Sequence, residues 1–278
     1  MNDSILEKQL SSSVIPSILK WSGSKRKQAR TIIKFIPKHT RYVEPFLGGG
    51  ALLFHNASNA LASDIYQPLI DFWNLVQKAP NELIDDYSQQ WERLQLDLPA
   101  YFYVVRDRFN STKDAKDLNF LLRTCVNGIV RFNDKGEFNN SFHLSRKGMN
   151  PKLFSNNVRI WSEQIKGVEF SCCDYEATLN RCKKGDFVYF DPPYLGSKNR
   201  YIDDLDFDRL IKNLENLNLR EVKWALSFDG SRGDKDLSAD IDNSIFKRKV
   251  MISNGHSAVK RVLNGPLEEV HESLYLNY

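Results

Sequence analysis

A short apolar run that ends in an acidic residue and two prolines most constrains how this chain can fold. Residues 187–190 are aromatic and β-branched, and a charged turn precedes them, as is typical of a buried strand. Asp191, Pro192, Pro193 and Tyr194 follow directly. Ligands of open α/β sheets bind at the carboxyl ends of the strands, so we expect this tetrapeptide to face a ligand.

The chemistry of the tetrapeptide suits a planar ring that carries an amino group. The Asp191 carboxylate can accept one hydrogen bond from such an amine. A proline carbonyl can accept the second, since its residue has no N–H that competes. Tyr194 offers a flat face for stacking. Asp191, Pro192, Pro193 and Tyr194 are therefore the candidate catalytic residues.

Strands and helices alternate at both ends of the chain but not in its middle. Strands are expected at residues 41–44, 60–63, 168–170 and 222–228, with a final pair near 246–252 and 271–276. The middle is mainly helical in pattern, with one hairpin around Asp134-Lys135-Gly136. The sequence therefore predicts an α/β fold, a doubly wound mixed sheet formed by residues 1–65 and 169–278. Residues 66–168 would form an inserted, mainly helical module.

Three further strand ends carry residues that can contact a ligand. Gly48, Gly49 and Gly50 follow the first strand and let a ligand approach the backbone closely. Asp64 ends the second strand, where it could bind a ribose or cap a helix, and Asp174-Tyr175 follows the third. The glycines fit neither the dinucleotide pattern nor a P-loop. S-adenosylmethionine (AdoMet) has a ribose, an adenine and a tail without phosphate, and fits this set of residues.

Four blocks of sequence resemble the Dam-type (alpha group) DNA adenine-N6 methyltransferases. They are residues 20–25, 44–50, 127–139 and 185–194, which occur in the order of that family and span almost the whole chain. The resemblance implies an AdoMet-dependent methyltransferase that acts on adenine in double-stranded DNA by base flipping. It also implies that the module at 66–168 recognises the target sequence.

The resemblance further implies roles for single residues. The cofactor would be bordered by Trp21, Lys25, Phe46, Gly48, Gly49, Gly50, Asp64, Asp174, Tyr175 and Asp191. DNA would be contacted by Lys25, Asn127, Arg131, Asn133, Asn139, Arg146 and Lys147. His143-Leu144 stands where GATC-specific members carry Gly-Arg. Leucine cannot donate two hydrogen bonds to guanine, so GATC is not expected as the target.

Composition narrows the remaining alternatives only a little. The net charge of +4 permits nucleic-acid binding without requiring it. We expect a monomer in the cytoplasm of a bacterial or phage-infected cell, associated with the nucleoid. We expect no signal peptide, no membrane span and no metal. The enzyme could be solitary or part of a restriction-modification system. Two alternatives stay open: an RNA adenine methyltransferase, and a non-catalytic DNA-binding protein on the same fold.

Overall fold

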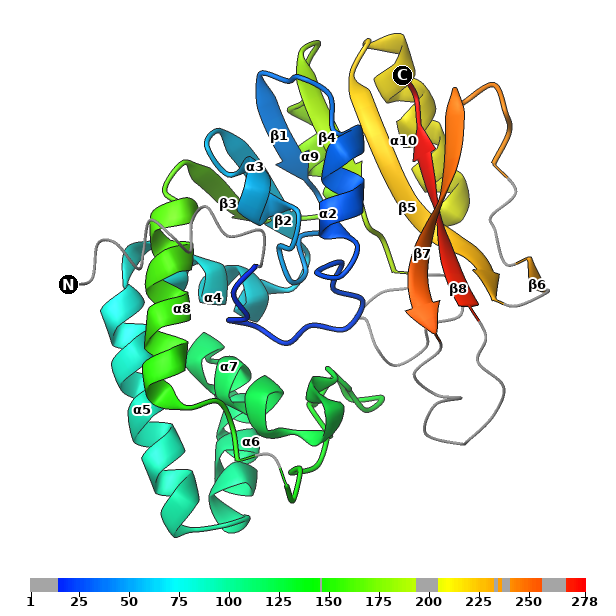
Figure 1. Ribbon diagram of the computed structural model, residues 1–278. Helices are drawn as coiled ribbons and strands as arrows, with labels where there is room; N and C mark the ends of the chain where they lie inside the picture. Colours follow the sequence, from blue (N-terminus) through cyan, green and yellow to red (C-terminus); the bar gives the residue numbers. More distant parts are fainter. Residues whose placement is uncertain (1–14, 146, 194–204, 233–234, 237–240, 257–268) are drawn as a thin grey trace.

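A computed structural model describes residues 15–145, 147–193, 205–232, 235–236, 241–256 and 269–278 (Figure 1). Two residues that the sequence singles out, Arg146 and Tyr194, lie outside the described residues. In the part of the chain described, no helix is both long and apolar enough to span a membrane.

A mixed β-sheet is formed by strands from the two outer parts of the chain, before residue 65 and after residue 167. Its order is β3-β2-β1-β4-β5-β8-β7, and β6 pairs with β5. The strands are β1 (Arg41–Glu44), β2 (Ala60–Asp64), β3 (Val168–Cys172), β4 (Asp186–Phe190), β5 (Lys223–Arg232), β6 (Lys235–Asp236), β7 (Arg248–His256) and β8 (Glu269–Leu276). Strands β1 to β5 are parallel to one another, and β8 runs antiparallel to β5 and β7. The predicted doubly wound mixed sheet is thus confirmed.

Alternate residues of the central strands face opposite sides of the sheet, and apolar side chains cover both sides. Val43 and Val188 pack in one cluster with residues of α9 (Tyr175–Asn180) and α10 (Phe207–Leu219). Tyr42 and Phe187, their neighbours in sequence, pack in the other cluster. That side includes the short helices α2 (Ala29–Ile32), η1 (Ile33–Phe35) and α3 (Leu53–Asn56). Burial on both sides explains why the strands appear as continuous apolar runs in the sequence.

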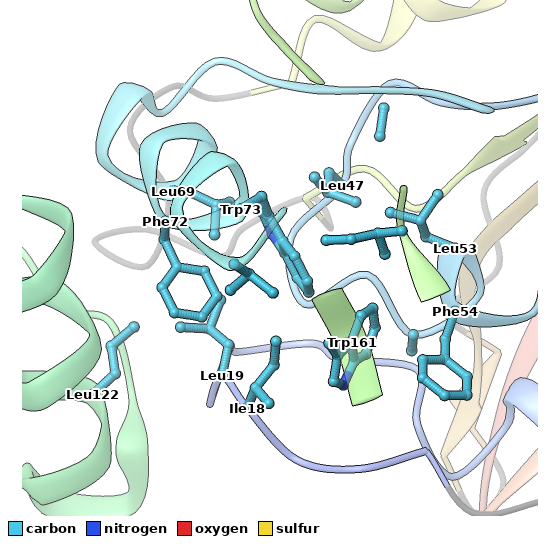
Figure 2. Close-up of a cluster of buried hydrophobic side chains, with 14 of the residues drawn as sticks. Ile18, Leu19, Leu47, Leu53, Phe54, Leu69, Phe72, Trp73, Leu122 and Trp161 are labelled. Carbon is cyan, nitrogen blue, oxygen red and sulfur yellow. The ribbon is translucent and has the colours of Figure 1, made fainter. Parts of the chain in front are cut away.

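The segment between β2 and β3 folds into helices, as its pattern predicts. They are α4 (Gln67–Lys78), α5 (Pro80–Leu96), α6 (Ala100–Thr112), α7 (Ala115–Thr124), η2 (Val126–Gly128) and α8 (Pro151–Gln164). Figure 2 shows Trp73 of α4 and Trp161 of α8 among buried apolar side chains, with ring centroids 4.9 Å apart. The same cluster contains Leu53 and Leu47 beside the sheet, so the helices share a core with the sheet.

The N-terminal segment crosses these helices before it reaches the sheet. Trp161 Nε1 donates to the carbonyl of Pro16 at 2.9 Å. Asn157 Nδ2 and Arg123 Nη2 donate to the carbonyl of Ser17 at 3.1 and 3.2 Å. Side chains of α7 and α8 thus fix the path of the chain just before Trp21 and Lys25.

Candidate active site

A cavity of about 520 Å³ lies at the carboxyl ends of β1 to β4. Every residue that the sequence predicts for the cofactor lines it, together with Pro192 and Pro193. Residues that are far apart in the sequence therefore meet at one edge of the sheet, as the alternation of strands and helices predicts. The roles of these residues remain predictions. Their contacts show which roles are chemically possible.

The glycine loop after β1 is held closely from three sides. Gly48 has a φ of +46°, which favours glycine, and its N–H donates to Asp64 Oδ2 at 3.1 Å. Its carbonyl accepts from Trp73 Nε1 at 3.2 Å. A Cβ on Gly48 would lie 2.9 Å from Cδ1 of Trp21. The loop therefore needs glycine both for its backbone conformation and for the space that Trp21 occupies.

Asp64 supports the glycine loop and keeps acceptor capacity for a ligand. Besides the bond from Gly48, its Oδ1 accepts from the N–H of Tyr66 at 3.1 Å. Tyr66, and not Asp64, is the N-cap residue of α4. Burial raises the pKa of the Asp64 carboxyl, and the backbone N–H donors partly oppose that shift. Each carboxylate oxygen can accept a second hydrogen bond, so a ribose hydroxyl could still bind here.

Asp174 is both a helix cap and one partner in a cluster of charges. It accepts from the N–H of Glu176 at 2.9 Å as the N-cap of α9. Arg209 of α10 donates to its two oxygens at 2.6 and 3.1 Å and also pairs with Glu176. The Arg209 guanidinium lies 4.9 Å from the centre of the Tyr175 ring, which is 5.1 Å from that of Phe46. Arg209 was not predicted, because no local pattern links α10 to the end of β3.

Asp191 is paired with a buried lysine that bonds a second acid. Lys25 Nζ lies 2.8 Å from Asp191 Oδ1 and 2.9 Å from Glu272 Oε1, and the Lys25 side chain is only 4% exposed. Burial lowers the Lys25 pKa, but the two carboxylates outweigh it and the net pKa is raised. Burial raises the pKa of Asp191 to about 6, although Lys25 opposes the shift. Lys25 was predicted both to border the cofactor and to contact DNA, and its side chain lines the cavity.

Another acid, Glu44 at the end of β1, also lines the cavity. It is buried, and its Oε2 accepts from the hydroxyl of Tyr42 at 3.0 Å. Burial raises the pKa of Glu44 well above its usual value, and the charge of Asp191 adds to the shift. Burial thus favours the neutral, protonated form of Glu44.

The predicted hairpin forms, and it adjoins the cavity. Phe132 and Phe138 form an antiparallel bridge, and Phe132 lines the cavity. Asn133, predicted to contact DNA, also holds the turn: its Oδ1 accepts from the N–H groups of Lys135 and Glu137, both at 3.0 Å. Its Nδ2 donates to Glu137 Oε2 at 2.9 Å.

Four further residues predicted to contact DNA are at least partly exposed. Arg131, Asn127 and Lys147 are exposed, and Asn139 is partly buried. Arg131 makes no ion pair with any residue that the structure describes, so the alternative of a pair with Glu137 is not realised. An exposed, unpaired guanidinium beside the cavity is available to DNA.

Helix α6 supplies a support for the hairpin that the sequence does not reveal. Asn110 donates from Nδ2 to the carbonyl of Phe138 at 3.1 Å. It also accepts at Oδ1 from the N–H of Phe138 at 2.8 Å. One amide side chain thereby satisfies both backbone groups of Phe138, as a neighbouring strand would. The described residues include no group of three or more His, Cys, Asp or Glu side chains that could hold a metal ion.

The strand order and the cavity together define a doubly wound α/β domain with a ligand site at the carboxyl ends of its strands. The family pattern of D12 class N6 adenine-specific DNA methyltransferases matches residues 21–255. The chain therefore belongs to this family of adenine-specific DNA methyltransferases.

Three relatives illustrate the range of the family. A type II methyltransferase of Methanocaldococcus jannaschii is 34% identical over 77% of this chain and 84% of its own length. A DNA adenine methylase of Haemophilus influenzae is 30% identical over 63% of each chain. A DNA N-6-adenine-methyltransferase of Escherichia phage P1 is 29% identical over 81% of this chain but only 31% of its own.

The matches with the second and third of these relatives thus span less than two thirds of their length. Among solved structures, an rRNA methyltransferase of Streptomyces viridochromogenes aligns along 97% of this chain and 91% of its own, with 13% identity and a TM-score of 0.42. A score that low supports no inference about this chain.

Proposed function

We propose that this chain transfers a methyl group from AdoMet to N6 of an adenine that is flipped out of double-stranded DNA. The observation that carries the proposal is the position of Asp191. It shares one cavity with the glycine loop and with Phe132 of the hairpin. A base that enters from the side of the hairpin would meet the Asp191 carboxylate within the cavity that is proposed to hold the methyl donor.

The residues present fit AdoMet. Gly48 and Gly50 both have positive φ, and a side chain at Gly48 would fill space against Trp21. Asp64 would bind the ribose hydroxyls, while Asp174 and Tyr175 would bind and cover the adenine. When bound, AdoMet supplies a sulfonium methyl group to a nucleophile in line with the carbon–sulfur bond.

The residues around the target base would position it and make its amine a better nucleophile. Extruding a nucleotide costs a few kcal/mol, and stacking on an aromatic ring such as Tyr194 would return roughly 1–3 kcal/mol. Asp191 and the Pro192 carbonyl would accept the two N6 hydrogens. Those bonds favour a pyramidal nitrogen whose lone pair is no longer delocalised into the ring. Positioning and fixed electrostatics then supply most of the rate enhancement.

The proton that leaves N6 after transfer can pass to Asp191. Burial raises the pKa of this carboxyl to about 6, which makes it a better base than an ordinary aspartate. At neutral pH it is still mainly ionised, so it can accept both the hydrogen bond and, later, the proton.

Arg131 is proposed to contact a base or phosphate of the DNA, and Asn127, Asn139, Arg146 and Lys147 are proposed as further DNA contacts. Leu144 is 85% exposed and lacks the donors that read guanine, so we propose a target other than GATC. We further propose that the chain acts in the cytoplasm and is a monomer in solution.

Substitution of Asp191 by asparagine tests the central proposal. Asp191→Asn should lose tritium transfer from labelled AdoMet to duplex DNA by at least about a hundredfold, as expected for loss of a general base. It should still bind AdoMet in equilibrium dialysis. Asp242→Asn, in an exposed turn, is the matched control. Full turnover by Asp191→Asn would refute the mechanism. Transfer by the wild type to RNA but not to duplex DNA would favour the RNA alternative.

A further inference from the structure

Glu272 bonds the lysine that pairs with Asp191, although it lies 247 residues from that lysine in the sequence. It stands on β8, the strand that runs antiparallel to β5, and is paired in register with Ile252 of β7. Lys25 Nζ lies 2.9 Å from Glu272 Oε1 and 2.8 Å from Asp191 Oδ1. The three charges therefore form a chain from the sheet's antiparallel part to the proposed target site.

We infer that Glu272 is a positioning residue for methyl transfer: it holds the Lys25 ammonium against Oδ1 of Asp191, which leaves Oδ2 to accept from the adenine amine. This inference rests on the proposed function. Asp191 has no other partner than Lys25 among the described residues, so Oδ2 is available.

The need for a second carboxylate follows from the shape of lysine. Its ammonium has three donors on a flexible four-carbon stem and fixes no geometry by itself. With Asp191 as its one acidic partner, the ammonium could move between the two oxygens and compete with the adenine amine for Oδ2. Glu272 binds the ammonium from the side of the sheet and confines it to Oδ1. Since the Lys25 side chain is only 4% exposed, bulk water has little access to replace that bond.

Glu272 also sets the charge around Asp191. Five ionisable groups interact electrostatically with Asp191: Lys25, Glu272 on β8, Glu44 and Tyr42 on β1, and Tyr189 on β4. Burial raises the pKa values of Glu44, Tyr42 and Tyr189 well above their usual values, which favours the neutral form of each. The charge of Glu272 raises the pKa of Asp191, while Lys25 lowers it. Removal of the Glu272 charge should therefore lower the Asp191 pKa, and removal of the Lys25 charge should raise it.

The test is single-turnover methylation of duplex DNA as a function of pH. The wild type should lose activity on the acid side near the Asp191 pKa of about 6. Glu272→Gln keeps the size of the side chain but removes its charge. We expect this variant to transfer the methyl group about tenfold more slowly. The acid limb, which is the part of the pH–rate profile where activity falls at low pH, should move down by about one pH unit, as loss of a neighbouring like charge does. AdoMet binding should change less than the transfer rate.

The matched control is Glu221→Gln, which removes an exposed acid that pairs with Lys184 at 2.8 Å. It should leave the rate and the pH profile unchanged. A Glu272→Gln variant with wild-type rate and profile overturns the inference. A slow variant with an unmoved acid limb and a lower melting temperature also overturns it, because it assigns Glu272 a structural task only.

A second variant keeps the inference testable if Glu272→Gln fails to fold. Lys25→Met should raise the acid limb by about 1–3 pH units, the usual effect of an opposite charge on a carboxyl. Adding Glu272→Gln to that variant should bring the limb back down, and an unchanged limb would overturn the inference. Failure of the proposed function is a separate result: the wild type would then methylate no DNA adenine at any pH.

Discussion

Replacing Gly48 with alanine should destabilise the glycine loop that lines the cavity, for two reasons. A left-handed conformation costs an alanine roughly 1–2 kcal/mol, and Gly48 has a φ of +46°. The new Cβ would also lie 2.9 and 3.1 Å from Cδ1 and Nε1 of Trp21, so the indole must move. Such overpacking costs a further ~1–3 kcal/mol. Trp21 lines the cavity, and its displacement should weaken AdoMet binding by about tenfold, or ~1.4 kcal/mol.

Gly136 provides a matched control for the backbone part of that cost. Its φ is +72°, and nothing lies within 4 Å of the Cβ that an alanine would add. Gly136→Ala should therefore cost only the ~1–2 kcal/mol of the left-handed conformation. At ~2–4 °C per kcal/mol for a chain of this size, Gly48→Ala should melt a few degrees below Gly136→Ala in scanning calorimetry.

Isothermal titration with AdoMet separates the two variants more sharply. Gly136→Ala should bind AdoMet like the wild type, because the hairpin turn does not line the cavity. Equal melting temperatures together with equal AdoMet affinities for the two variants would refute the reasoning from Trp21. A loss of affinity in both would instead show that the hairpin turn contributes to the cofactor site.

Three further predictions concern the charges and the hairpin. Arg131→Ala should relax specificity at one base position at a cost of roughly 1–3 kcal/mol in competitive binding, whereas a uniform loss on all sequences would make it a phosphate contact. Asn110→Ala leaves the backbone groups of Phe138 unpaired and should weaken DNA binding while AdoMet binding stays normal; unaltered DNA affinity would contradict this. The Asp191 pKa is raised from 3.8 to about 6, so its contribution to stability is present at pH below about 4 and is lost as pH rises through 6. The difference in unfolding free energy between wild type and Asp191→Asn should fall by about 3 kcal/mol across that range, and a constant difference would argue against the raised pKa.

Much of the architecture is readable from local pattern. The glycines after β1 and the acids at or just after the ends of β2, β3 and β4 each follow a strand-like run, and the sheet rule places them at one edge. The spacing of Leu69, Phe72 and Trp73 likewise predicts the buried side of α4, as observed. The strand order was not needed for these predictions, because the carboxyl ends of parallel strands share an edge in any order.

The partners of the site residues could not be predicted in this way. Glu272 meets Lys25 only because β8 inserts between β5 and β7, and no pattern near either residue encodes that insertion. Arg209 reaches Asp174 from a helix that follows another strand. Helix α6 is rich in aromatic and β-branched residues, which favour strands, so the support from Asn110 was hidden as well. Pairing between distant elements decides these contacts.

The long connection between β2 and β3 has a consequence for how such enzymes diversify. The two strands pair directly, Ala60 with Val168 and Asp64 with Cys172, so a crossover need only return along one strand of about 15 Å. A dozen residues would be enough for that return. This chain uses all of residues 65–167, and both endpoints are fixed by the sheet. Outside the residues that line the cavity, this stretch can therefore change in length or sequence without moving the strand ends. By the role proposed above, such changes would alter which DNA sequence is selected.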